Sequence, residues 1–183
     1  MSVRVHADGL ARCGWLNDDV TYIDYHDNEW GTPLAGDDAM FERLSLEGFQ
    51  AGLSWLTILK RREGFRAAFA DFEMARVAEF TEEDVARLLL DEGIIRHRGK
   101  IEATIKNARI ALELDSGLER FILAFQPRTD RRGLTVSPES EALSKALRKL
   151  GFSFVGPTTM HALMQATGMI QDHEVGCHFK TGN

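Results

Sequence analysis

Gly151-Phe152-Ser153-Phe154-Val155-Gly156-Pro157-Thr158-Thr159 joins two stretches with helical periodicity. The first stretch begins at Ser137-Pro138, which fits an N-cap followed by proline at the first helical position, and it ends near Leu150. The second stretch runs from Met160 to Gly168. The sequence therefore predicts a helix-hairpin-helix element with a tight turn that contains Gly156.

The rest of the chain has helical periodicity almost throughout. Apolar side chains recur at helical spacing in Asp37–Phe49, Leu53–Lys60, Thr81–Gly93 and Arg98–Leu114. Lys60-Arg61-Arg62 suits the C-terminal end of the second of these stretches, and Thr81 with Asp84 resembles a capping box at the start of the third. No segment shows sustained two-residue alternation, so we predict an all-α fold. The polar segment Gln126–Val136 is the one expected linker.

Length and composition fit a soluble globular protein. The 183 residues suit one domain or two tightly packed lobes, and the apolar fraction of 44% and charged fraction of 27% are ordinary. The first residues contain no apolar core of signal-peptide length, and no apolar run approaches the roughly 18 residues of a membrane helix. We therefore expect a cytoplasmic protein with no membrane partner, and a monomer.

The net charge of −6 is unevenly distributed. Residues 1–59 contain three basic and ten acidic residues, whereas the remaining 124 residues contain 19 basic and 18 acidic ones. Cationic groups occur at 60–62, 96–100 and 145–149. A local basic face is sufficient for phosphate contact, so the acidic total does not exclude nucleic acid.

Two connections between helices are candidate DNA contacts. The hairpin opens a helix whose first N–H groups are free to bind phosphate, and Gly93-Ile94-Ile95-Arg96-His97-Arg98-Gly99-Lys100 is a second, cationic connection. The candidate contacts are Gly151, Gly156 and Thr158 in the hairpin, and Arg96, Arg98 and Lys100 in the cationic connection. The alternatives are a glycine-containing corner without a ligand and cations at solvated helix ends.

The only two cysteines each have a histidine nearby. The spacings are Cys13-x12-His26 and His173-x3-Cys177. Two thiolates and two imidazoles are a ligand set that a closed tetrahedral Zn2+ site prefers, so we predict one structural zinc that joins the ends of the chain. A disulfide would leave both histidines unexplained, and two unrelated buried thiols are the remaining alternative.

Aromatic residues are concentrated in the first third of the chain. All three tryptophans and both tyrosines lie before residue 56, and they are Trp15, Tyr22, Tyr25, Trp30 and Trp55. Such a cluster forms either a small core or a cage for a flat ligand. Charged residues surround several of them, which favours the rim of a pocket over a dry core.

Glu47 is an isolated carboxylate within Leu44–Trp55, a mostly apolar stretch with two glycines. A buried charge there must be met by hydrogen-bond donors, or the pKa of the group must change. The glycines permit close approach of the backbone to another group. The alternative is a helix end from which Glu47 points to water.

Four motifs together resemble the type I 3-methyladenine DNA glycosylases, zinc-containing members of the helix-hairpin-helix glycosylase superfamily. The motifs are His26-Asp27-Asn28-Glu29-Trp30-Gly31, Leu46-Glu47-Gly48-x-Gln50-Ala51-Gly52-Leu53-Ser54-Trp55, Gly93-Ile94-Ile95-Arg96-His97-Arg98-Gly99-Lys100-Ile101 and Gly151-Phe152-x-Phe154-Val155-Gly156. They occur in the family's order and spacing from about Arg12 to Cys177. Residues 1–11 are then a short extension, and 12–183 form one glycosylase domain.

The resemblance implies the roles of the candidate residues. Glu47 would hydrogen-bond the extruded base, and Tyr22, Tyr25 and Trp55 would line the base pocket, with Trp15 and Trp30 close by. The zinc would be held by Cys13, His26, His173 and Cys177. The implied partners are double-stranded alkylated DNA and the released base, 3-methyladenine.

Two departures from the wider superfamily bear on the mechanism. Most members carry an aspartate two residues before the histidine that follows the hairpin, whereas this chain has Gln171 there and Asp172 one place later. We therefore assign no catalytic aspartate. Pro157, Thr158 and Thr159 occupy the place of the lysine that bifunctional glycosylase/lyases use, which predicts a purely hydrolytic enzyme.

A zinc-stabilised helical module that binds nucleic acid without catalysis is the competing function. Glu47 distinguishes the two, because a module that only binds nucleic acid needs no buried carboxylate facing a base.

Overall fold

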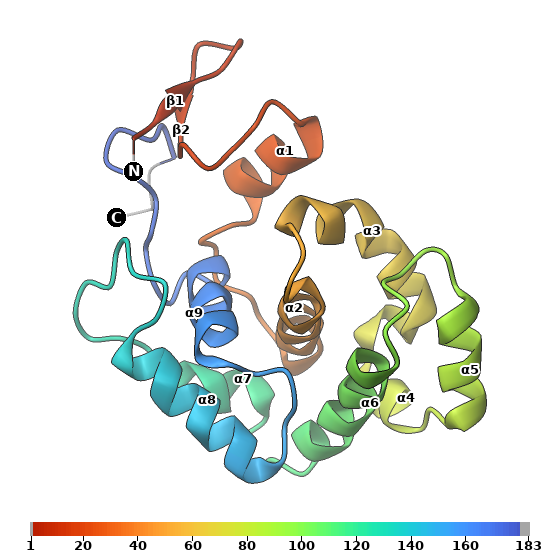
Figure 1. Ribbon diagram of the computed structural model, residues 1–183. Helices are drawn as coiled ribbons and strands as arrows, with labels where there is room; N and C mark the ends of the chain where they lie inside the picture. The colour runs from red at the N-terminus through yellow and green to blue at the C-terminus, as the bar shows by residue number, and fades with distance from the viewer. Residues whose placement is uncertain (1, 180–183) are drawn as a thin grey trace.

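The computed structural model describes residues 2–179 (Figure 1). Two short strands come first, β1 (Arg4–Val5) and β2 (Ala11–Arg12). The helices are α1 (Val20–Asn28), α2 (Asp37–Gln50), α3 (Trp55–Ala68), the single turn η1 (Ala70–Phe72), α4 (Met74–Ala78), α5 (Glu82–Leu90), α6 (Arg98–Leu112), α7 (Leu118–Leu123), α8 (Pro138–Leu150) and α9 (Pro157–Ala166). The predicted helical fold is confirmed.

The N-terminal hairpin corrects the all-α prediction in one detail. Arg4 pairs with Arg12 and Val5 with Ala11 in an antiparallel register. Two residues per strand are too few for alternation to show in the sequence. The expected boundary between an extension and the domain, at residue 12, falls within β2.

Helix α2 is the central element, and α3, α6, α7 and α9 all pack against it (Figure 1). Asp37 and Asp38 occupy its first turn, where negative charge is favourable. Most of its remaining side chains are buried, including Phe41 and Phe49. The Phe49 ring lies 4.6 Å from the ring of Phe65 in α3. Because α2 is covered on several sides, a polar side chain on one of its buried faces can reach solvent only through a cavity.

Helix α3 is longer than predicted. The cationic stretch 60–62 was expected to end it, but the helix continues to Ala68 because Phe65 and Ala68 are buried against the core. The cations therefore lie in the middle of α3. There Lys60 pairs with Asp19, and Arg62 Nη2 donates to Glu29 Oε1 at 2.8 Å.

The predicted pair of helices at the hairpin is present. The Ser137 hydroxyl accepts a hydrogen bond from the Ser140 N–H at 3.1 Å, as the N-cap prediction requires. Gly151 ends α8 with φ +103°, a left-handed conformation that favours glycine. Proline follows Gly156 at the first position of α9.

The N-terminal hairpin and the segment after α9 lie side by side (Figure 1). The His178 N–H donates to the Ala11 carbonyl at 2.6 Å. This pairing brings residues near both ends of the described chain to one place. Between residues 2 and 179, no helix is both long and apolar enough to cross a membrane.

Gly64 allows α3 to touch the turn that precedes α6. A Cβ atom on Gly64 would lie 2.5 Å from the carbonyl oxygen of Gly93. Gly64→Ala should therefore destabilise the protein by ~1–3 kcal/mol, even though alanine favours helix by about 1 kcal/mol. Urea unfolding measures the difference, with exposed Glu63→Ala as the control. A Gly64→Ala protein as stable as the wild type would show that the two segments do not touch.

Candidate active site and metal centre

A cavity of about 320 Å3 opens between α1, α2, α3, α9 and the segment at 133–135. Its walls are mainly aromatic and apolar, with a few polar groups. The lining residues are Trp15, Tyr22, Tyr25, Trp30, Glu47, Gln50, Trp55, Gly133, Leu134, Thr135, Thr158, Ala162, Gln165 and Asp172. Its size and composition fit a small flat molecule.

The five aromatic residues singled out in the sequence all line this cavity. Ring centroids are 5.0 Å apart for Trp15 and Tyr22, 5.0 Å for Trp15 and Trp30, and 5.5 Å for Tyr25 and Trp55. The tilted and edge-on arrangements are those that aromatic rings prefer. The sequence indicated that these aromatic residues form one cluster, and in the structure they surround one cavity.

Glu47 is buried at 4% exposure and lines the same cavity. Burial raises the pKa of its carboxyl group to about 7, and the positive charge of Arg43 opposes that shift. No residue between 2 and 179 donates a hydrogen bond to this carboxylate. The alternative of a helix end pointing to water is therefore wrong, because the group is enclosed within the protein.

Arg43 is a buried cation that the sequence reading did not single out. Its Nη1 donates to the Tyr25 hydroxyl at 2.9 Å, and its guanidinium carbon lies 5.2 Å from the Tyr25 ring centroid and 5.4 Å from that of Trp55. Glu29 bonds both Arg43 and Arg62. This chain of contacts fixes one aromatic wall. The sequence contained one signal for this role, because Arg43 lies four residues before Glu47 and therefore on the same face of a helix.

The Trp55 indole N–H is buried and has no acceptor among residues 2–179. A buried donor without a partner is costly. Because Trp55 also lines the cavity, its N–H is available to an acceptor on a bound molecule. Glu47 and Trp55 thus offer an acceptor and a donor to the same space.

The opposite wall was missed at the sequence level. It includes Gly133, Leu134 and Thr135, from the segment read as a linker. Asp172 fixes this segment, because its Oδ1 accepts from the Gly133 N–H and its Oδ2 accepts from Gln165 Nε2, both at 2.6 Å. Gln171, at the position considered for a catalytic aspartate, instead donates to the Gly168 carbonyl.

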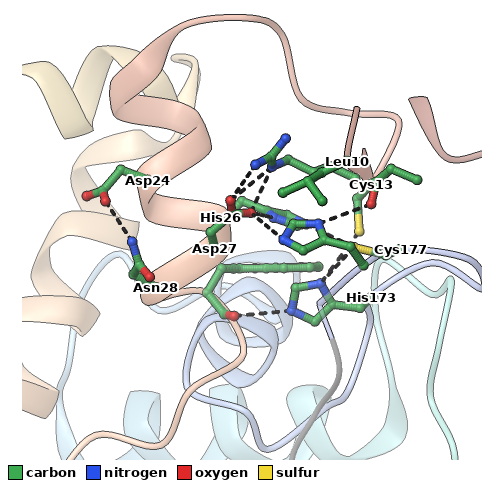
Figure 2. A network of polar contacts seen from close by, with 12 residues as sticks. Leu10, Cys13, Asp24, His26, Asp27, Asn28, His173 and Cys177 are labelled. Atoms are coloured by element: carbon green, nitrogen blue, oxygen red, sulfur yellow. Dashed lines mark hydrogen bonds and ion pairs between the residues drawn. The ribbon is translucent and has the colours of Figure 1, made fainter. Parts of the chain in front are cut away.

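Cys13, His26, His173 and Cys177 converge beside the cavity, and their ligand atoms lie within 4.8 Å of one another (Figure 2). Three of the four sulfur–nitrogen distances are 3.7 Å for Cys13–His173, 3.5 Å for Cys177–His26 and 3.8 Å for Cys177–His173. Tetrahedral zinc, with bonds of ~2.3 Å to sulfur and ~2.0–2.1 Å to nitrogen, separates such atoms by about 3.6 Å. The cluster can hold a metal ion.

Neighbouring groups orient the two imidazoles. His26 Nδ1 contacts Asp27 Oδ1 at 2.8 Å, and His173 Nε2 contacts the Trp30 carbonyl at 3.3 Å, so the other ring nitrogens face the thiols. Metal-binding histidines commonly have such partners. Burial raises the pKa of the Cys13 thiol, so a thiolate there requires a nearby cation.

A family model described as methyladenine glycosylase matches residues 15–181. The chain belongs to the methyladenine glycosylase family. The resemblance of the four motifs to the methyladenine glycosylases is thereby confirmed.

Relatives of this glycosylase match over almost their whole length. DNA-3-methyladenine glycosylase 1 of Escherichia coli (strain K12) is 48% identical over 185 residues, which is 95% of this chain and 99% of the relative. A crystal structure of 3-methyladenine DNA glycosylase I has a TM-score of 0.87 at 47% identity, covering 91% of this chain and 98% of that one. A variant of 3-methyladenine DNA glycosylase I in complex with 3-methyladenine has a TM-score of 0.85 at 34% identity, covering 91% and 96%.

The candidate DNA contacts of this methyladenine glycosylase lie in different surroundings. Arg98 is exposed but pairs with Glu82 and Glu102, and exposed Arg96 lies 4.0 Å from Glu92. Gly151 and Gly156 flank the hairpin turn. Thr158 is exposed and also lines the cavity, so it joins the hairpin to the pocket.

Lys100 is not a phosphate contact, contrary to the prediction. Its side chain is buried at 7% exposure, and its Nζ donates to the carbonyls of Phe49 at 2.9 Å and Ala51 at 2.8 Å. These carbonyls lie at the C-terminal end of α2, where a cation is favourable. The prediction failed because a buried and an exposed lysine look alike in a cationic stretch.

Replacement of Glu47 should stabilise the folded protein. A carboxyl group whose pKa is about 4.5 when unfolded and about 7 when folded lowers stability as pH rises through this interval. Glu47→Gln should therefore raise the free energy of unfolding by up to ~3 kcal/mol at pH 8, and most of that gain should disappear at pH 5. Urea unfolding at both pH values measures it, and equal stability at pH 8 would contradict burial of the charge.

Proposed function

We propose that this family member is a monofunctional DNA-3-methyladenine glycosylase. It would act as a monomer on double-stranded alkylated DNA, hydrolyse the N-glycosidic bond of 3-methyladenine and release the free base. The observation that carries the proposal is the buried Glu47 carboxylate within a cavity of five aromatic residues. A relative named DNA-3-methyladenine glycosylase 1 and a related structure in complex with 3-methyladenine support the choice of base.

The aromatic cavity suits the charge of the damaged nucleotide. Methylation at N3 gives adenine a positive charge within the nucleotide, which weakens the glycosidic bond and makes the departing base neutral. Each electron-rich ring favours such a cation by about 0.5–2 kcal/mol. Extrusion from the duplex is also cheapest for a damaged base. The positive charge of the damaged base and its easy extrusion would therefore account for much of the rate of excision and of the selectivity for that base.

Glu47 and Trp55 would read the edge of the base. The ionised Glu47 carboxylate accepts a hydrogen bond from the exocyclic amine and balances the charge of the base. The unpartnered Trp55 N–H donates to a ring nitrogen. A pKa of about 7 for Glu47 means that charge balance requires near-neutral or higher pH.

The competing function, nucleic-acid binding without catalysis, gives the buried Glu47 carboxylate no role. Its burial disfavours folding at neutral pH, as the raised pKa shows. A protein that only binds a duplex backbone gains nothing in return. A glycosylase gains recognition of the damaged base.

The Cys13, His26, His173 and Cys177 cluster would hold one structural Zn2+. Four protein ligands complete a tetrahedral site and leave no open position for catalysis. The ion would supply a cross-link between the two ends of the chain. Cys13 and Cys177 form no disulfide, so both sulfurs are available to the ion. The cytoplasmic location expected from the sequence would keep them reduced.

The purified protein should contain one zinc per chain by elemental analysis. Because metal binding contributes to folding, a chelator and His173→Ala should each lower the melting temperature markedly. Refolding with zinc should restore the chelated protein. Fully folded, active protein that contains no metal would contradict a structural zinc site.

Incubation with methylated DNA should release 3-methyladenine, identified by mass. Glu47→Gln places an amide donor opposite the base amine, and a mispaired buried polar group costs ~1–3 kcal/mol, so excision should slow by one to two powers of ten. Glu42→Gln is the matched control, because Glu42 lies on the same helix and binds Arg66. Full-speed excision by Glu47→Gln would remove Glu47 from base recognition.

Strand cleavage should not accompany excision. In the described part of the chain no lysine lines the cavity, so no amine is in place to attack the sugar. Borohydride should therefore trap no covalent protein–DNA adduct, with a bifunctional glycosylase as the positive control. A trapped adduct would show that the enzyme is not purely hydrolytic.

A further inference from the structure

We propose that helix α6 fixes the positions of two surface loops relative to each other, so that both contact the DNA beside the extruded nucleotide. Lys100 and Asn107 are the positioning residues. The proposal rests on the glycosylase function above. The first loop is the pocket turn, Ala51–Ser54, and the second is the hairpin, Gly151–Gly156. Helix α6 runs beside both α2 and the α8–α9 connection (Figure 1).

The two loops adjoin residues that line the cavity. The pocket turn lies between Gln50 and Trp55, which both line the cavity, and its Leu53 is 40% exposed. The hairpin leads into α9, whose Thr158 also lines the cavity. An extruded nucleotide would reach the cavity between these loops, and the flanking DNA would contact both.

Lys100 holds the pocket turn. Its ammonium donates to the carbonyls of Phe49 and Ala51, at 2.9 and 2.8 Å. Both carbonyls lie where α2 ends and the turn begins. A buried cation bonded to the last carbonyls of a helix fixes the direction in which the chain leaves it.

Asn107 holds the hairpin from the same face of α6. Its Nδ2 donates to the Ser153 carbonyl at 3.0 Å, and its Oδ1 accepts from the Ser153 N–H at 2.9 Å. Seven residues separate Lys100 from Asn107, which is two helical turns and about 10 Å. Phe154 of the hairpin approaches Gly48, so the hairpin also packs against the last turn of α2, which leads into the pocket turn.

Other contacts hold most of the aromatic and polar walls of the cavity. Arg43 fixes Tyr25, and Asp172 fixes the opposite wall, independently of α6. Loss of either α6 contact should shift a loop relative to the cavity while leaving the base pocket intact. Displacements of about 1 Å can lower a rate by ~100-fold when they change how the substrate is positioned.

The decisive experiment compares Lys100→Met and Asn107→Leu with Arg109→Met. Arg109 is a matched control, because it lies on the same helix and also donates to two backbone carbonyls, those of Ala78 and Phe80, away from the cavity. Excision of 3-methyladenine from duplex DNA, affinity for a duplex with an abasic-site analogue, and affinity for free 3-methyladenine are measured on folded protein. Lys100→Gln and Asn107→Ser serve where an apolar variant does not fold.

We expect Lys100→Met and Asn107→Leu each to lose tenfold or more in kcat/KM on duplex DNA and in affinity for the abasic duplex. Affinity for free 3-methyladenine should stay within about threefold of wild type. The slope of log affinity against log salt should not change in Lys100→Met, because no phosphate contact is lost. Arg109→Met should excise at the wild-type rate.

Three results would overturn the proposal. The first is excision and abasic-duplex affinity at the wild-type level in both α6 variants. The second is a salt slope reduced by about one unit in Lys100→Met. The third is a loss of excision in Arg109→Met equal to that in the α6 variants Lys100→Met and Asn107→Leu. The abasic-duplex measurement requires no catalysis, so it tests the α6 contacts even if wild-type protein releases no base. That last outcome would contradict the proposed function instead.

Discussion

The burial of one carboxylate constrains the rest of this structure. Glu47 lies on α2, which other helices cover on several sides, and the group faces an aromatic cavity without a hydrogen bond from residues 2–179. Charging it there is unfavourable, as its raised pKa of about 7 shows. Nearby Arg43 reduces this cost and also holds Tyr25. The protein thus keeps a destabilised charge in place, which a cationic base would neutralise under the proposed function.

The metal cluster and the cavity are built from the same segments. Trp15 follows Cys13 by two residues, Tyr25 precedes His26, and Asp172 precedes His173. The Trp30 carbonyl contacts the His173 ring. A metal ion that joins the ends of the chain would therefore also fix both sides of the pocket. Such an ion would support the shape of the pocket without taking part in the reaction.

Local chemistry made much of this molecule predictable from its sequence. Ser137 and Gly151 carry their signals within a few neighbouring residues, so the ends of α8 could be placed. The predictions that were wrong concerned residues whose surroundings depend on contacts between distant parts of the chain. The Lys100 ammonium is bound by carbonyls about 50 positions earlier in the chain, and the segment at Gly133 is held in the pocket wall by Asp172, 39 positions later. No local pattern contains such information.

The most direct test of the account is the ionisation of Glu47 itself. Its carboxyl carbon can be labelled with carbon-13 and its chemical shift followed against pH, with and without 3-methyladenine. The account predicts a pKa near 7 in the free protein, which should fall when the base binds, because the bound base favours the carboxylate. A pKa near 4.5 in the free protein, or one that the base leaves unchanged, would contradict it.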